Sequence, residues 1–430
     1  MPRMGRANLV VLAGAVGMLG WGTVLPYQYV YAASSRGWGT IAAAAASSLF
    51  SVGALLAAPL GGRLADRVSP VRVAVVAKLV AAAATAAMLV ASTPAAFLAA
   101  MLVFGAGITA AQPAQAVLIL RWVGSQDRRK VFAWQFTASS VGMAVGALLA
   151  AQVVDLKTPA GMVPAFVIAT VGFGLSALLV ALAGRRAPRE HESVESVDGV
   201  DVVDASSADR PRSGSASVAA TVRMLWAVPG IRWVAVVTTL VTLGFYAQFE
   251  SGLPAYGLLF LDIPERTIGI AAAVNCLVIV ALQMAVVRLT ARRNAASLLV
   301  VVGLVWVGCW SVMAVASATS PPVAALLFVT TYGVFAVGET LFAPVLSPLT
   351  ASLAPAGMVG TTLGLVTSLQ TGVSALGPLL AGVALAGGHP TLFVAVHLAI
   401  SVGAVLAALR LRRVLRSAPS AQRVLDEVGI

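Results

Sequence analysis

The chain has 430 residues, of which 59% are hydrophobic and only 10% are charged, whereas about a quarter of a soluble domain is usually charged. So few charges cannot cover a water-facing surface, and the composition therefore excludes an ordinary soluble protein. The net charge of +12 does not indicate nucleic-acid binding, because the arginines flank apolar stretches and do not interleave with aromatic residues on one polar face.

Twelve apolar runs follow one another along the chain, and uncharged runs of about 18 or more residues are typical of membrane-spanning helices. The first follows Arg3 and Arg6 and continues past Trp21 without a small-residue cleavage site, so we interpret it as a retained helix and not a signal peptide. Six runs come before residue 185, at 9–33, 40–60, 73–91, 95–120, 132–154 and 162–183. Six follow residue 230, at 233–258, 267–287, 295–317, 323–349, 361–385 and 392–411.

This pattern predicts an all-α integral membrane protein with twelve transmembrane helices in two pseudo-symmetric six-helix bundles, at residues 1–184 and 226–417. A cytoplasmic linker, residues 185–225, mixes Ser, Asp, Glu, Val and Arg and cannot bury a core. A solvated tether is favoured over a segment that binds a cation or a partner. Residues 418–430 form a cytoplasmic tail.

Short matches indicate that the two halves are repeats of each other. Gly107 and Pro113 in the fourth run have the same spacing as Gly338 and Pro344 in the tenth, and GALLAA in the fifth run resembles GPLLAG in the eleventh. Parallel repeats around a binding site near the middle of the membrane are a known transporter architecture.

Positive charges gather on one side of the predicted membrane. With both termini inside, all but three of the 28 Lys and Arg residues fall on the inner side, and the exceptions are Arg36, Lys157 and Arg266. Because Lys and Arg accumulate in cytoplasmic loops, we predict a multi-pass protein of the cytoplasmic (inner) membrane with both termini in the cytoplasm.

No pattern for metal binding or catalysis is present in the sequence. Cys276 and Cys309 lie within apolar runs, which predicts neither a disulfide framework nor a thiolate metal site. The three histidines lack the spacing of zinc ligands, and His397, in the twelfth run, is interpreted as structural. Neither HExxH nor GxSxG occurs. We expect no metal, no cofactor and no enzymatic activity.

The segment after the second run, GGRLADRVSPVRV, resembles the signature G-x-x-x-D-R-x-G-R-R of the major facilitator superfamily. Gly62, Asp66 and Arg67 match it, SPV replaces Gly-Arg-Arg, and Arg72 restores a positive charge nearby. The resemblance implies that Asp66 latches the inner gate by pairing with basic groups or a helix N-terminus. The alternative is a charged turn that only fixes the topology. Ala291 stands at the corresponding place in the second half, so any carboxylate latch is single.

Two further stretches resemble the twelve-helix bacterial multidrug/proton antiporter branch of this superfamily. Gly377 and Pro378 are similar to the antiporter motif, which that branch carries in its fifth helix, where this chain has Gly142 and Gly146 instead. The stretch GETLFAP around Glu339 is similar to the glycine-glutamate stretch in the tenth helix of such antiporters. The resemblance implies proton-coupled efflux.

Two acids, Glu250 and Glu339, fall within predicted spans, and we expect no Lys or Arg deep in one. An ionisable residue inside the bilayer is by default a functional hypothesis. Glu339 lies near mid-depth of the tenth span, and we interpret it as a proton carrier or cation site, the alternative being a hydrogen-bonded core glutamate. Glu250 is a second candidate, although its aromatic neighbours are also typical of an interfacial belt. A carboxyl group removed from water favours its neutral form, which suits proton loading and release.

Polar side chains at membrane depth are candidates for the substrate cavity, although each also suits an interhelical hydrogen bond. The lack of a deep base argues against anions, which leaves neutral or cationic molecules. The candidates for substrate contact are Tyr27, Gln28, Gln112, Gln115, Trp134, Gln135, Tyr246, Asn275, Gln283, Tyr332 and Gln370.

These observations together favour a monomeric, proton-coupled exporter of apolar or cationic small molecules. Its partners would be a small-molecule substrate, protons and the lipid bilayer, with no nucleic acid. The first alternative is a transporter of a sugar, amino acid or other metabolite in the same fold, against which the missing deep base counts. A non-transporting membrane receptor or membrane enzyme is the alternative from another class.

Overall fold

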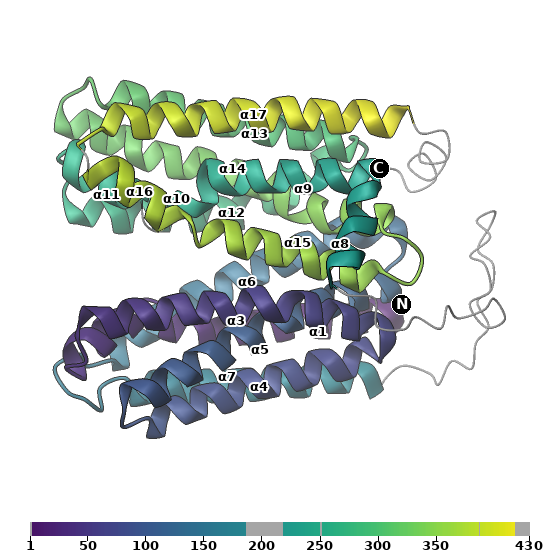
Figure 1. Ribbon diagram of the computed structural model, residues 1–430, viewed down its shortest axis with the longest axis horizontal. Helices are drawn as coiled ribbons and strands as arrows, with labels where there is room; N and C mark the ends of the chain where they lie inside the picture. The colour runs from purple at the N-terminus through teal and green to yellow at the C-terminus, as the bar shows by residue number, and fades with distance from the viewer. Residues whose placement is uncertain (1, 186–217, 250–251, 387, 418–430) are drawn as a thin grey trace.

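Two helical bundles lie side by side in the computed structural model, and the beginning of α1 (Pro2–Val24) and the end of α17 (Pro390–Arg416) lie at the same end of the molecule (Figure 1). The structure describes residues 2–185, 218–249, 252–386 and 388–417. Within these ranges, eleven helical segments are long and apolar enough to cross a membrane. The predicted all-helical membrane fold is confirmed.

The first bundle contains six long helices, and two short helical segments follow the first of them. Prolines begin α4 and α5, where the ring suits the first turn and the missing N–H is not needed. The Thr93 side chain caps α5 by accepting a hydrogen bond from the Ala96 N–H. The elements are α1 (Pro2–Val24), α2 (Gln28–Val30), η1 (Tyr31–Ser35), α3 (Gly39–Arg67), α4 (Pro70–Val90), α5 (Pro94–Trp122), α6 (Ser125–Val153) and α7 (Val163–Arg185).

The second bundle repeats this plan with two interrupted spans. The seventh span of the chain, which is the first of this bundle, is divided among α9 (Pro229–Val241), η2 (Thr242–Tyr246), α10 (Ala247–Phe249) and α11 (Gly252–Phe260). The eleventh span is divided between α15 (Val359–Ser374) and α16 (Gly377–Ala386), and Pro378, which has no backbone N–H for the helical hydrogen bonding, follows the break. The other elements are α8 (Val218–Ala227), α12 (Glu265–Thr290), α13 (Ala295–Ala316), α14 (Pro321–Leu353) and α17 (Pro390–Arg416).

Two of the differences from the predicted boundaries concern the motif after the second span and the linker. The second span was predicted to end at residue 60, but α3 continues to Arg67, so Gly62 and Asp66 lie in a helix and not in a loop. Hydropathy ends where the charges begin, whereas backbone hydrogen bonding continues. Helix α8 begins at Val218, inside the predicted linker. The rest of that linker, except Arg185, and the predicted tail lie outside the described residues.

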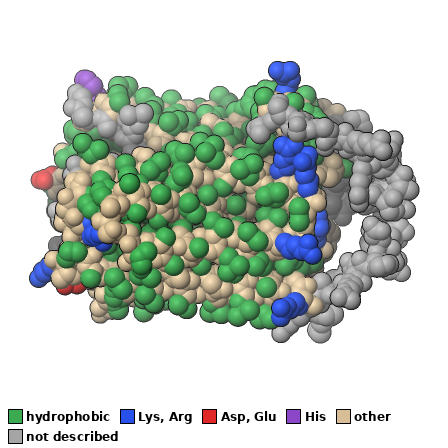
Figure 2. Space-filling view, turned by 60° about the horizontal axis from the view of Figure 1, so that its bottom comes forward, with side chains coloured by type: hydrophobic (Ala, Val, Ile, Leu, Met, Phe, Trp, Pro, Cys, Tyr) green, Lys and Arg blue, Asp and Glu red, His purple; other side chains and the backbone are tan. Residues whose placement is uncertain are grey.

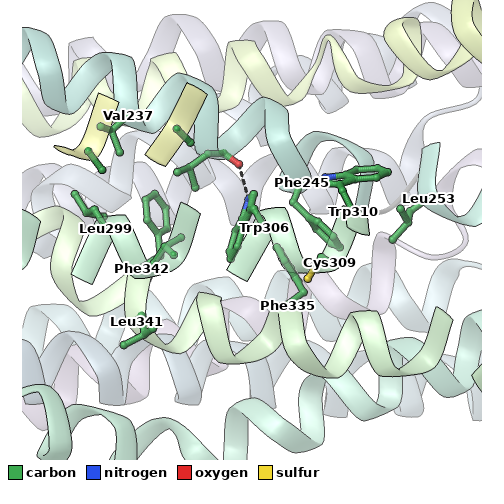
Figure 3. Packing of buried hydrophobic residues seen from close by; sticks show 14 of the residues in the cluster. Val237, Phe245, Leu253, Leu299, Trp306, Cys309, Trp310, Phe335, Leu341 and Phe342 are labelled. Atoms are coloured by element: carbon green, nitrogen blue, oxygen red, sulfur yellow. Dashed lines mark hydrogen bonds between the residues drawn. The ribbon is translucent and has the colours of Figure 1, made fainter. Parts of the chain in front are cut away.

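The largest buried cluster belongs to the second bundle and surrounds Trp306 (Figure 3). Trp306 Nε1 donates a hydrogen bond at 3.0 Å to the carbonyl of Val241, the residue that precedes the π-helix η2. Phe245 and Phe335 stack with their ring centroids 3.9 Å apart. A Cβ atom at Gly338 would overlap the Trp306 ring, so only glycine allows α14 to pack this closely beside Glu339.

Glycines bring the two bundles together at the end that carries the termini. A Cβ atom at Gly62 of α3 would overlap the Gly360 carbonyl group of α15, and Gly364 packs equally closely on α3. Small residues of this kind allow membrane helices to approach backbone to backbone. The α3–α15 contact is therefore a tight seam between the halves.

An apolar surface covers the sides of the molecule, and basic side chains gather at the end near the termini (Figure 2). This distribution agrees with helices that cross a bilayer and carry their arginines into water. Which side of the membrane this end faces stays a prediction, namely the cytoplasmic side. We call it the inner end below.

Candidate functional site

A cavity of about 470 Å³ lies between the two bundles. Helices α1, α4, α5, α6 and α7 line it from the first half, and η2, α14 and α15 line it from the second. Cavities of a few hundred Å³ that combine an apolar wall with a few polar groups are typical of small-molecule sites. This cavity is therefore the candidate substrate site.

Five of the predicted substrate-contact residues meet at this cavity, namely Gln112, Gln115, Gln135, Tyr246 and Gln370. They come from α5, α6, η2 and α15, so the fold joins residues that are far apart in the chain. The Gln115 side chain is buried, and its Nε2 donor has no partner within the described part of the chain. Whether these five side chains contact substrate stays a prediction.

The other predicted candidates lie elsewhere. Trp134 is 52% exposed on α6, and Tyr27 and Gln28 lie beyond the end of α1. Tyr332 donates its hydroxyl hydrogen to the Phe249 carbonyl at 2.8 Å, and Gln283 Nε2 donates to the Thr340 carbonyl at 3.0 Å. Tyr332 and Gln283 thus make the interhelical hydrogen bonds that were the alternative interpretation.

Glu339 is buried in α14, with 8% of its surface exposed. Asn275 of α12 donates from Nδ2 to Glu339 Oε2 at 2.8 Å. Among the residues that the structure describes, no Lys or Arg forms an ion pair with it. A buried carboxyl group held by one amide has to be neutral or to exchange protons. The second predicted acid, Glu250, lies outside the described residues.

The prediction that no basic residue lies deep in a span is wrong. Lys78, inside the predicted 73–91 span, is only 5% exposed and lines the cavity. Its Nζ donates to Ser176 Oγ of α7 at 2.7 Å, and Ser176 donates in turn to the Ala13 carbonyl of α1. Lys78 was missed because the mean hydropathy of the run 73–91 stays high in spite of one charged residue, although the sequence contains this lysine.

Asp66 joins the first bundle to the start of α15 at the inner end. Its Oδ1 accepts a hydrogen bond from the Gly360 N–H at 2.6 Å. Its Oδ2 accepts from the Thr361 N–H at 2.6 Å and from Thr361 Oγ1 at 2.7 Å. A carboxylate in this place satisfies unpaired N–H groups and meets the positive end of the helix dipole. Of the other motif residues, Arg67 and Arg72 have exposed side chains.

Arg129 forms a second junction that sequence reasoning missed. From α6, its Nη1 donates to the carbonyls of Thr290 and Ala291 at 3.2 Å and of Arg293 at 2.9 Å. These carbonyls lie at the end of α12, where a cation meets the negative end of the dipole. Ala291 occupies the position in the second half that corresponds to Asp66. Its carbonyl accepts a hydrogen bond from Arg129, whose charge is opposite in sign to that of Asp66.

The inner halves of the two bundles are thus held together. A further hydrogen bond runs from Ser368 Oγ of α15 to the Leu55 carbonyl of α3 at 2.6 Å, nearer the middle of both helices. Together with the Asp66 and Arg129 contacts, it closes the inner end. Opening this end would require all three contacts to break.

Comparison with known proteins gives a consistent result. The family model described as Major Facilitator Superfamily matches residues 10–378. No curated protein matches the chain.

Solved structures with a similar fold include a bacterial homologue of the iron transporter ferroportin in the outward-facing state, with soaked iron. It is 16% identical with a TM-score of 0.72, over 94% of this chain and 99% of that chain. The human organic anion transporter MFSD10 (TETRAN) is 18% identical with a TM-score of 0.69, over 95% and 100%. The E. coli fucose:proton symporter is 13% identical with a TM-score of 0.67, over 96% and 99%. At these identities the likeness shows the fold alone.

Proposed function

Because the chain belongs to the Major Facilitator Superfamily, whose members transport small molecules, we propose that it is a proton-coupled exporter that works by alternating access. The observation that carries the proposal is Glu339, a buried carboxyl group that accepts a hydrogen bond from one amide and belongs to α14, a helix that lines the cavity between the two bundles. Such a group is costly in a membrane unless it is used or neutralised. We place both termini in the cytoplasm, as the charge distribution predicts.

Proton exchange at Glu339 follows from its surroundings. Glu339 is buried, and Asn275 is its hydrogen-bond partner among the described residues, so the neutral acid is the favoured form. When the cavity opens to water, the carboxylate can be solvated and the proton released. A change of protonation then accompanies each change of access, which is what coupling requires.

Alternating access follows from the two junctions at the inner end. Asp66 holds α15 and Arg129 holds α12, so the bundles separate on this side only when both helix ends are released. Rocking of one bundle against the other is a common transporter motion, and it leaves the binding site at the centre. We therefore assign Asp66 and Arg129 to the inner gate, with Gly62 as the close contact between backbones.

The cavity supports a substrate with an apolar body. Aromatic side chains of both halves line it, among them Phe132, Phe136, Phe173 and Phe342. The preference for cationic molecules rested on the absence of a deep base, and Lys78 removes that argument.

A second candidate function is uptake of a polar metabolite, such as a sugar, by the same fold. Lys78 supplies the buried base that this alternative had lacked beside the acid Glu339, and Gln112, Gln135 and Gln370 add amide groups at the cavity. The direction of transport separates the two candidates. Accumulation in everted vesicles under an imposed pH gradient indicates export, and accumulation in right-side-out vesicles indicates uptake.

Proton coupling is tested with purified protein in liposomes that contain a pH-sensitive dye. A panel of neutral, acidic and basic amphipathic compounds should drive proton movement through the wild type, whereas Glu339→Gln should abolish it and leave exchange down a substrate gradient intact. Asp155→Asn, which removes an exposed carboxylate in the α6–α7 connection, should behave as wild type.

Two results would contradict the proposal. Proton movement through Glu339→Gln at the wild-type rate would exclude Glu339 as the carrier, and a larger loss in Glu250→Gln would transfer the role to that acid. If no compound moves protons through the wild type, coupling to protons is refuted.

A further inference from the structure

Lys78 places a cationic group at the cavity, and neither the inner gate nor proton exchange at Glu339 uses it. We infer that Lys78 binds a carboxylate group of the substrate, so that the transported molecules are small organic acids with an apolar body. The inference rests on the proposed transport function and names the substrate class of the same site.

The ammonium group of Lys78 has more donors than described partners. It carries three N–H groups, and Ser176 Oγ accepts one at 2.7 Å. Ser176 already gives its own hydrogen to the Ala13 carbonyl, so it can only accept from the lysine. No carboxylate of the described chain forms an ion pair with Lys78. A buried charge without a counter-charge is costly, and a bound anion would compensate it.

Space beside the ammonium group is kept open by a glycine. Gly17 of α1 lines the cavity, and a Cβ atom there would lie 3.5 Å from Lys78 Nζ and 3.3 Å from Ser176 Oγ. Any larger side chain would occupy the approach to the lysine. The arrangement leaves room for a ligand atom at Lys78 Nζ.

A second unpaired donor lies in the same half of the cavity. Gln115 Nε2 is buried in α5 and has no partner within the described residues. Lys78 Nζ, with Ser176 as its one described partner, and Gln115 Nε2, with none, both favour a further acceptor. A carboxylate offers two oxygens and the opposite charge for this purpose. A singly charged carboxylate suits the site better than a phosphate dianion, because Lys78 is the one cation among the described lining residues.

The rest of the cavity fits an apolar body. Phe173 lies on the first half, and Phe342, Leu346 and Leu363 line the second half. A volume of about 470 Å³ accommodates a molecule of moderate size. The class that fits these walls is an aryl or alkyl carboxylic acid.

The competing explanation is that Lys78 only ties α4 to α7. A neutral amide could make the same hydrogen bond to Ser176, so a purely structural role does not depend on charge. Thr170 of α7 donates to Thr85 of α4 at 3.0 Å, away from the cavity, and provides a matched tie between the same two helices. Thr170→Val is therefore the control for a lost α4–α7 contact.

The test measures binding to purified protein in lipid nanodiscs by titration calorimetry, without any gradient. The probes are phenylalkanoic acids with chains of increasing length, each paired with its primary amide. We expect at least one acid to bind the wild type about tenfold or more tightly than its amide, as loss of a charged hydrogen bond implies. Lys78→Gln should abolish this preference, and Thr170→Val should keep it.

A second variant tests the inference in case the Lys78→Gln protein does not fold. Gln115→Glu keeps the lysine but adds a carboxylate to the same half of the cavity, so it should also remove the preference for acids. The inference is overturned if no acid in the panel binds the wild type more tightly than its amide. It is also overturned if both variants keep the wild-type preference.

Failure here is distinct from failure of proton coupling. If acids and amides bind equally while compounds still drive proton movement that requires Glu339, only the assignment of Lys78 falls. If acids bind through Lys78 but no proton movement accompanies transport, the coupling proposal falls and the substrate class stands.

Discussion

Replacing Asp66 with Asn should shift the protein toward an arrangement that is open at the inner end. The side chain keeps its size, but one of its two oxygens becomes an NH₂ group that faces the N–H donors of α15. Of the three hydrogen bonds that Asp66 accepts, at least one is lost, together with the charge at the helix N-terminus.

The magnitude follows from the number and kind of contacts. A hydrogen bond to a charged group contributes about 1.5–3 kcal/mol, and a charge at a helix end contributes about 0.3–1 kcal/mol. Since Asn retains one acceptor, we expect the closed state to lose about 2–3 kcal/mol relative to the open state. That loss is roughly a 30- to 150-fold change in the ratio of the two states.

The assay is the distance between spin labels on the two halves at the inner end. Labels at Ser69 and Ala356, both exposed, report this separation after Cys276 and Cys309 have been replaced. Asp66→Asn should add a population at longer distance. Asp127→Asn, which removes an exposed carboxylate near the same end, should not. Identical distance distributions for Asp66→Asn and the wild type would refute the latch.

Two further predictions concern the second junction and the core. Arg129→Gln should also increase the long-distance population. In the double variant with Asp66→Asn the two free-energy changes should add, because the two residues act on separate helix pairs. A double variant that is no more open than either single variant would show that the two residues support one shared contact. Trp306→Phe removes the hydrogen bond to the Val241 carbonyl and should cost about 0.5–1.5 kcal/mol, measured as a lower melting temperature in detergent. An unchanged melting temperature would show that this hydrogen bond does not stabilise the bundle.

The membrane spans could be predicted from sequence because each is a long apolar run with at most one charged residue, bounded by charges or by proline and glycine. Helix ends could not. Hydropathy records where lipid contact stops, and α3 continues beyond that point to Arg67. The break between α15 and α16 was missed because the run 361–385 carries no charge that would interrupt it, although Pro378 lies within it.

Residues of the candidate site could be predicted only where a single residue stands out in the sequence by its type and position. Glu339 is conspicuous in an apolar run, and its burial agrees with the expectation. Its amide partner, Asn275, was expected at the cavity and lies against the acid instead, because helix rotation decides which way a polar side chain points. Arg129 is one of many basic residues at the inner end, and only the packing of α6 against α12 distinguishes it.

The opposite signs of the two inner-gate charges have an electrical consequence. Asp66 and Arg129 belong to the same half and sit at the same end, so a rocking motion carries a negative and a positive charge together. The electrical work on the two charges cancels when they move together. A single unit charge that crosses the whole membrane field, by contrast, changes the free energy by about 2.3 kcal/mol per 100 mV. Membrane voltage therefore does not act on the gate through this pair. Any voltage dependence of transport has to arise from the groups at the central cavity and from the substrate itself.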